Sequence, residues 1–171
     1  MVAPRKFAAL AAGLIVAGTP FVLAGHAAAE PITGSCDGGV IHFNSDPIGL
    51  VPSSDNATFT GNFGGCNGTP ASGATFNGNF IGTASCFDIN GQVDGTMTWS
   101  NGEVSKVSGP WHVPGGVGAA ATNTVDISDG PGTGGKLYVD QGPVNGGAMV
   151  GPCLIDQARN GEIPINGLRL S

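Results

Sequence analysis

Residues that commonly perform nucleophilic catalysis are sparse in this sequence. Beyond residue 30 there are two histidines, His42 and His112, and no G-x-S-x-G motif occurs. A hydrolytic triad needs an activated serine or cysteine beside a histidine and an orienting acid. His42 alternates with Ile41 and Phe43, which is typical of an outward-facing position on a strand. We therefore expect a non-catalytic protein.

One acidic stretch is a candidate for metal binding. Asp88, Asn90 and Asp94 place three oxygen-bearing side chains within seven residues, and hard oxygen ligands on glycine-rich segments suit calcium. The stretch lacks the D-x-D-x-D-G run and the bidentate glutamate of an EF-hand. The same residues suit a type I′ hairpin with Asn90-Gly91 at its tip. We favour the hairpin over the calcium site, and the sequence predicts no cofactor.

Aromatic side chains are the best candidates for ligand contact. Trp111 lies between a proline and His112 in a segment rich in glycine and proline, so we expect it on a loop and partly exposed. Trp99 ends a run of alternating apolar residues, so we expect it in the core. The candidate ligand-binding residues are therefore Trp111, His112 and Tyr138, and the ligand would be a carbohydrate or a small apolar molecule.

The four cysteines are expected to form two disulfides, because their number is even and the chain carries an export signal. They are Cys36, Cys66, Cys86 and Cys153, and separations of 30, 20 and 67 residues exclude the close pairs of a zinc site. Three connectivities are open. We favour Cys36–Cys66, which would tie the opening strand to the next long strand, and Cys86–Cys153, which would anchor the C-terminal segment to the middle of the chain.

The first 29 residues are typical of a secretory signal peptide. Arg5 and Lys6 precede an uncharged, apolar stretch, and Ala27 and Ala29 form a small-residue cleavage site. We expect cleavage after Ala29, a secreted or extracellular protein, association with the cell envelope as an alternative, and no stable membrane anchor after cleavage.

The expected mature chain, residues 30–171, suits a single domain. It holds four basic and twelve acidic residues, which is a net charge of about −8. Nucleic acid and anionic membranes repel such a protein, so we do not expect either as a partner. The sequence does not indicate an oligomeric state.

The secondary-structure pattern is that of short strands joined by tight turns. Asn-Gly occurs seven times among 31 glycines, and this pair suits the turns between antiparallel strands. The motif A-T-F-x-G-N-F begins at Ala57 and again at Ala74. It predicts a β-hairpin whose Phe59/Phe63 and Phe76/Phe80 stripes face the core.

Further strands are expected at 39–43, 86–89, 92–99, 103–107, 119–127, 136–141, 148–150 and 163–170, with loops at 109–118, 128–135 and 142–147. Turn residues recurring about every ten positions favour a sandwich or a barrel. The predicted fold is therefore all-β, an antiparallel sandwich or partly closed barrel of about 8–10 short strands with two disulfides.

The order of short motifs resembles a known group of proteins. The motifs are V-I-H-F at 40–43, G-N-F-G-G-C at 61–66, G-T-A-S-C at 82–86 and G-x-x-x-W-S-N-G at 95–102. Between Cys36 and Val107 the chain resembles an uncharacterised family of small secreted β-sandwich proteins from high-GC Gram-positive bacteria. The resemblance implies export, β structure and disulfides, and it assigns no site residues.

These observations favour a secreted, non-catalytic protein that acts through its surface or a shallow pocket. Two more specific functions remain open. One is a binding module for a polysaccharide or an apolar small molecule, which predicts exposed aromatic residues in a concavity. The other is an envelope structural or assembly protein, which predicts an exposed strand edge or apolar patch that self-associates.

Overall fold

The computed structural model describes residues 32–171, and these form a single antiparallel sheet. Its strands are β1 (Gly34–Cys36), β2 (Gly38–Ile48), β3 (Ser53–Gly64), β4 (Ala74–Ala84), β5 (Asp88–Trp99), β6 (Val104–Pro114), β7 (Ala121–Asp129), β8 (Lys136–Gln141) and β9 (Ala158–Leu170). Between them lie two 3-10 segments, η1 (Gly116–Gly118) and η2 (Val144–Gly147), and the one-turn helix α1 (Val150–Cys153). The predicted signal peptide lies outside the described residues.

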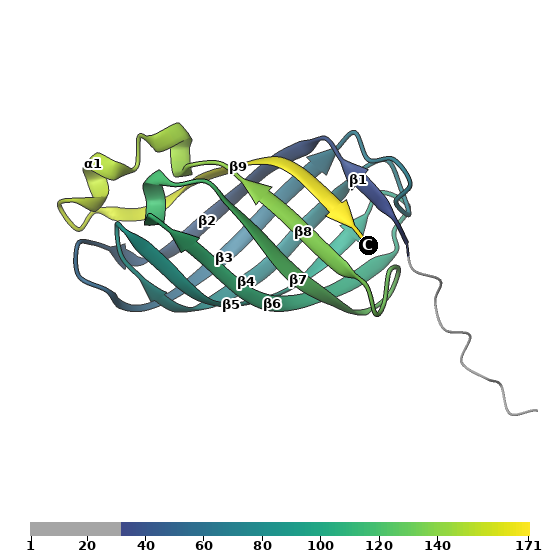
Figure 1. Ribbon diagram of the computed structural model, residues 1–171, viewed down its shortest axis with the longest axis horizontal. Coiled ribbons are helices and arrows are strands. Elements are labelled where there is room, and N and C mark those ends of the chain that lie inside the picture. The colour runs from purple at the N-terminus through teal and green to yellow at the C-terminus, as the bar shows by residue number, and fades with distance from the viewer. Residues whose placement is uncertain (1–31) are drawn as a thin grey trace, which may run out of the picture.

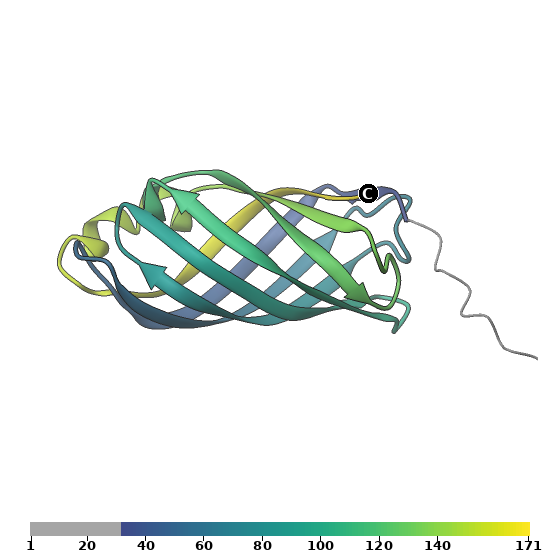
Figure 2. The ribbon, with the colours of Figure 1, turned by 60° about the horizontal axis from the view of Figure 1, so that its bottom comes forward.

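The sheet closes on itself because β9 pairs with strands on both sides. The strand order is β1-β9-β2-β3-β4-β5-β6-β7-β8, and an additional β8–β9 pairing joins the two ends. Val40 pairs with Pro164 on one side of β9, and Leu137 pairs with Leu170 on the other. The result is an elongated eight-stranded barrel with tilted strands and β1 as an extra strand (Figures 1 and 2). The predicted all-β class is confirmed, and the continuous pairing fits the barrel alternative.

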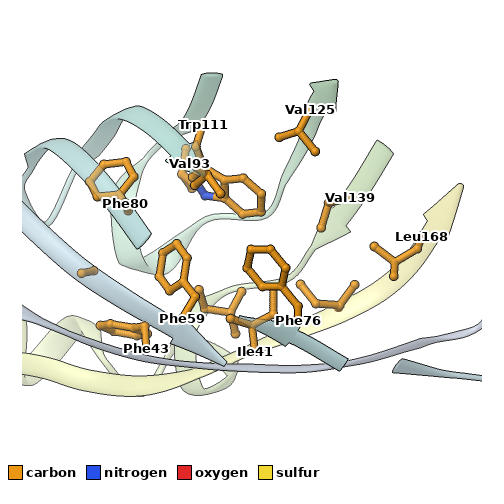
Figure 3. Packing of buried hydrophobic residues seen from close by; sticks show 14 of the residues in the cluster. Ile41, Phe43, Phe59, Phe76, Phe80, Val93, Trp111, Val125, Val139 and Leu168 are labelled. Atoms are coloured by element: carbon orange, nitrogen blue, oxygen red, sulfur yellow. The ribbon is translucent and has the colours of Figure 1, made fainter. Parts of the chain in front are cut away.

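Strand alternation fills the barrel with apolar side chains. On β3 every second residue from Asp55 to Phe63 is buried, and on β4 the inward positions alternate with exposed ones. The Phe59/Phe63 and Phe76/Phe80 stripes all lie in the core, and Figure 3 shows Phe59, Phe76 and Phe80 there. The predicted hairpin is confirmed, because the two copies of the repeat lie on neighbouring antiparallel strands, β3 and β4.

The glycine in the repeat also faces inward, between its two phenylalanines. A Cβ atom built on Gly78 would lie 2.5 Å from Cζ of Phe76. The bulky ring therefore occupies space that a side chain at Gly78 would need, and glycine in a strand often marks such a close approach. The repeat A-T-F-x-G-N-F thus places two large inward rings on either side of a glycine, and a ring fills the space that a side chain at this glycine would take.

The predicted hairpin tip at Asn90-Gly91 is wrong, because both residues lie inside β5. Gly91 pairs with Gly82 on β4 and with Trp111 on β6. Residues 88–89 and 92–99, predicted as parts of two strands, therefore belong to one continuous strand, and Cys86 and Phe87 precede it. Pairing on both sides holds the chain extended through a dipeptide that would form a turn in an isolated hairpin.

The predicted loop at 109–118 is wrong for residues 109–114, because β6 continues to Pro114, whereas residues 115–118 do lie outside the strands. The pairing of β6 with β7 ends at Ser108. Further along, the His112 N–H donates a hydrogen bond of 2.8 Å to the Asn123 side chain on β7. Residues two apart in a strand direct their N–H groups to the same side, so an N–H at position 110 would point toward β7, as that of His112 does. Proline has no N–H, and it is tolerated at position 110 because β6 and β7 are no longer paired there.

The segment predicted as a strand at 148–150 instead belongs to a cap over one end of the barrel. Asn145, Gly146 and Gly147 have φ values of 48°, 62° and 95°. Such left-handed conformations interrupt an extended chain. Ala148 follows η2, and Val150 begins α1. By contrast, the strand predicted at 136–141 is confirmed as β8.

Both predicted disulfides are confirmed. Cys36 is bonded to Cys66, and Cys86 to Cys153. The second bond ties α1 to the connection between β4 and β5. Two disulfides in a protein of this size are compatible with an extracellular location. In the part of the chain that the structure describes, no helix is long and apolar enough to cross a membrane.

Candidate functional site

The two tryptophans lie inside the barrel. Trp111 is 6% exposed, and its ring centroid lies 6.4 Å from that of Phe59. Trp99 is 2% exposed, and its Nε1 donates a hydrogen bond of 2.9 Å to Oγ of Ser105. The expected burial of Trp99 is confirmed, and the expected exposure of Trp111 is wrong. Once β6 extends past residue 109, Trp111 takes the inward position two residues before Val113.

The other two candidate residues, His112 and Tyr138, lie on the outer surface, and each contacts a different partner. Nε2 of His112 is 2.9 Å from Oδ1 of Asp88 on the neighbouring strand. The Arg169 guanidinium lies 5.3 Å from the centre of the Tyr138 ring, which is a cation–π contact. Because Trp111 faces the interior, Trp111, His112 and Tyr138 do not form one aromatic platform.

The calcium candidates do not converge on one point. Asp88, Asn90 and Asp94 all lie on the outer face of β5. Six residues of extended strand span about 20 Å, so Asp88 and Asp94 are too far apart to ligate one ion. Within residues 32–171 no group of three His, Cys, Asp or Glu side chains is arranged to hold a metal.

A groove with a volume of about 620 Å³ crosses β3, β4, β5 and β6 on the outer surface of the barrel. Two rows of outward side chains run across these strands in register. The Asp94 row consists of Thr58, Asn79, Asp94 and Ser108, and the Lys106 row of Thr60, Asn77, Thr96 and Lys106. The two rows are about 7 Å apart along each strand, since each strand contributes one residue to each row at positions i and i+2.

Backbone forms the floor of this groove. Between the rows lie Phe59, Gly78, Gly95 and Val107, which also line it. Phe59 and Val107 are buried with their side chains in the core. Nothing projects outward between the two rows, so the groove is open along its length and bordered by polar side chains.

The neutral polar side chains in the two rows along the groove form no hydrogen bonds with other described residues. In residues 32–171, no side-chain hydrogen bond involves Thr58, Thr60, Asn77, Asn79, Thr96 or Ser108. Each hydroxyl can donate and accept, and each amide offers two donors and an acceptor. They are therefore available to a ligand that carries both kinds of group.

Lys106, the charged residue of the Lys106 row, forms an ion pair at one end of the groove. Nζ of Lys106 lies 3.0 Å from Oδ2 of Asp129, with which it pairs across the β6–β7 bulge. The hydrogen bond from Lys106 lowers the pKa of Asp129 from its usual value, and the backbone N–H of Gly130 acts in the same direction. This exposed pair leaves the middle of the groove neutral apart from Asp94.

No family model, no curated protein and no solved structure matches this chain. The functional assignment therefore depends on the geometry described above. Sequence analysis did not identify the groove, although one feature indicates it. Threonine and asparagine occupy the outward positions of both repeats, but alignment of these residues into rows depends on the register of four strands.

A second surface feature is an exposed apolar patch at the capped end of the barrel. We define this patch as the exposed large apolar residues on the segments that meet there, namely Leu50, Val51, Phe87, Val150, Leu154 and Ile155. Phe87 is 60% and Ile155 64% exposed. The Cys86–Cys153 disulfide and a hydrogen bond from Cys86 N–H to the Gly49 carbonyl hold the contributing segments together. Figure 1 shows α1 at the left end of the barrel.

Proposed function

We propose that this protein is a secreted, non-catalytic binding protein whose outer groove binds a hydroxyl-rich polymer, namely a polysaccharide. The observation that carries the proposal is the pair of unpartnered polar rows beside the groove. Neighbouring strands repeat about every 4.8 Å, so each row presents hydroxyl and amide groups at a regular interval. A polymer with regularly repeated hydroxyl groups complements such a row.

The size and charge of the groove agree with this ligand. Its volume of about 620 Å³ falls in the usual range for ligand sites. Six of the eight side chains in the rows are neutral, which favours an uncharged polymer. Recognition would depend on hydrogen bonds, because both tryptophans lie in the core.

Export is the other part of the proposal. The expected signal peptide supports it, and the two disulfides are compatible with it. N-terminal sequencing of protein recovered from the culture medium should give Glu30 as the first residue. Recovery of the chain with Met1 intact would contradict export by cleavage.

A pull-down experiment with insoluble polysaccharides tests the groove. Purified protein should co-sediment with at least one neutral polysaccharide from a panel that includes cellulose, chitin and β-1,3-glucan. The double variant Asn77→Ala/Asn79→Ala should bind at least tenfold more weakly, since it removes two amides from the middle of the groove.

The matched control for this experiment is Asn62→Ala/Asn90→Ala. These two asparagines are also exposed on β3 and β5 but do not line the groove. The control should bind like the unmodified protein. Equal loss of binding in both variants, or no binding of the unmodified protein to any member of the panel, would overturn the proposal.

The apolar patch favours a second candidate function, assembly with another copy of this chain. The mature chain is acidic, so two copies approach most easily through an apolar surface such as this patch. Burying its large apolar side chains between two copies would stabilise the pair. Light scattering coupled to size exclusion should then show a dimer that Phe87→Ser/Ile155→Ser dissociates.

The control for assembly is Val104→Ser, which changes an exposed apolar residue at the start of β6, outside the patch. It should leave the dimer intact. A monomer at high micromolar concentration of the unmodified protein would exclude assembly through the patch.

A further inference from the structure

Asp55 is a carboxyl group buried inside the capped end of the barrel. It is 5% exposed and lies at an inward position of β3, two residues before Ala57. Its Oδ1 has no hydrogen-bond partner in the described structure. An unpaired buried oxygen of this kind is costly, and native proteins contain few of them.

A second unpartnered oxygen lies on the same cavity. Gln141, at the end of β8, is 3% exposed, and its Oε1 likewise has no partner among the described residues. Asp55 and Gln141 both line a cavity of about 30 Å³ at this end of the barrel. That volume holds one or two water-sized groups. Two oxygen acceptors without donors therefore belong to residues that line a space large enough for a small donor.

No basic side chain of residues 32–171 forms an ion pair with Asp55. Burial raises the pKa of its carboxyl above the usual value, and the nearby charge of Asp46 adds to this increase. Backbone hydrogen bonds from Asp46 and Asn56 act in the opposite direction. The carboxylate form at neutral pH thus lacks a counter-charge, which a bound cation would supply.

Aromatic rings form much of the remaining wall. Phe43, Phe59, Phe80 and Trp111 line the cavity, and Figure 3 shows all four pointing into the interior. The Phe59 ring centroid lies 6.4 Å from those of both Phe80 and Trp111. The faces of aromatic rings attract cations, most strongly where water is excluded.

We propose that this cavity is a binding site for a small ammonium group, of the size of ammonium ion or methylammonium. An ammonium group has several N–H donors, so it can satisfy both Asp55 and Gln141, whereas a hydroxyl has a single donor. Its charge balances Asp55, and a methyl group would contact the aromatic wall. A cation with two heavy atoms matches a volume of about 30 Å³.

The ligand would enter through the cap. Val117 of η1 and Val144 of η2 line the cavity and are buried. Gly115 and Gly116, at the start of η1, have positive φ values of 97° and 62°. Both 3-10 segments are single short turns with few internal hydrogen bonds, so local opening costs less here than in the barrel wall.

Carboxyl-carbon NMR of Asp55 tests the proposal directly, with methylammonium chloride as the probe and sodium chloride at equal ionic strength as the reference. Because the cation favours the ionised carboxylate, methylammonium at tenfold its Kd should lower the apparent pKa of Asp55 by about one pH unit. The melting temperature should rise at pH 7 with methylammonium and should not rise with methanol, which is similar in size but uncharged.

The matched variants are Asp55→Asn and Asp46→Asn. Asp55→Asn should abolish the increase in melting temperature, and Asp46→Asn, which changes an exposed neighbour, should retain it. A titration of Asp55 that methylammonium does not change would overturn the proposal, as would an equal response to methanol or full retention in Asp55→Asn. If Asp55→Asn does not fold, the titration of the unmodified protein decides alone. These outcomes are independent of polysaccharide binding in the outer groove.

Discussion

Phe80 on β4 and Gly91 on the neighbouring strand β5 lie in direct contact on the inner face of the barrel. A Cβ atom on Gly91 would approach Cε2 of Phe80 to 2.6 Å, which is closer than any side chain tolerates. Phe80 is almost completely buried, so its ring cannot move away without disturbing the core. The Ile81 carbonyl oxygen would lie closer still to the same Cβ atom, so the ring and the neighbouring backbone together explain why a glycine occupies this position in the middle of a strand.

Replacing Gly91 with alanine should therefore destabilise the protein by about 1–3 kcal/mol through overpacking. Urea denaturation monitored by circular dichroism measures the change. Gly64→Ala is the control, because Gly64 is exposed at the end of β3 and a Cβ there meets no atom within 4 Å. Unchanged stability of Gly91→Ala would mean that the Phe80 ring is not held against this strand.

A second prediction concerns the polar contact of Trp99 in the core. Ser105 is 1% exposed, accepts a hydrogen bond from the Trp99 indole and donates one of 2.8 Å to the Pro131 carbonyl. Ser105→Ala leaves the indole N–H unpaired and should cost about 1–3 kcal/mol. Ser54→Ala, on the exposed face of β3, should change the free energy of unfolding by less than about 0.5 kcal/mol. Similar values for both variants would contradict this assignment.

Burial of both tryptophans predicts a simple spectroscopic result. Acrylamide should quench the fluorescence of the native protein far less than that of the urea-unfolded chain, since neither indole is accessible. Variants that retain a single tryptophan separate the contributions of Trp99 and Trp111. Free quenching of the variant that retains Trp111 would place its ring at the surface.

The two disulfides should differ in their contribution to stability. They close chain separations of 30 and 67 residues, for which loop-closure entropy gives about 3.6 and about 4.4 kcal/mol. Replacing Cys86 and Cys153 with alanine should therefore lower the free energy of unfolding more than replacing Cys36 and Cys66. Chemical denaturation of the two double variants measures both values, and the reverse order would indicate that strain or residual structure dominates.

Asp55 predicts a dependence of stability on pH in a buffer free of ammonium. Its folded-state pKa is raised, so the folded state binds the proton more tightly than the unfolded chain does. Stability is then lost as pH rises from about 3.8, the ordinary value, to the raised pKa, and remains lower above it. Asp55→Asn should match the unmodified protein near pH 3 and exceed its stability at pH 7. A less stable variant at pH 7 would show that the ionised carboxylate stabilises the fold.

Local alternation in the sequence predicted a large part of the structure. The inward stripes of phenylalanine, the hairpin of β3 and β4 and the strand at 136–141 depend on residues close together in the chain, and all three are confirmed. The disulfide pairing also agreed with expectation, because tying the first strand to the next long strand suits an antiparallel sheet. For the strands, the alternation of apolar and polar residues along a single segment determines which side each residue faces.

Long-range pairing decided the rest. Barrel closure depends on β8 and β9 meeting, for example at Leu137 and Leu170, which no local pattern indicates. Trp111 faces inward because pairing with β5 keeps β6 in an extended conformation through its proline-containing segment. Asp55 follows two serines in a stretch that resembles a turn, yet pairing with β4 places it at the inward position shared with Ala57. A shift of one residue in strand register exchanges the two faces, so the polar groove and the buried carboxyl both exist only once all strands are paired.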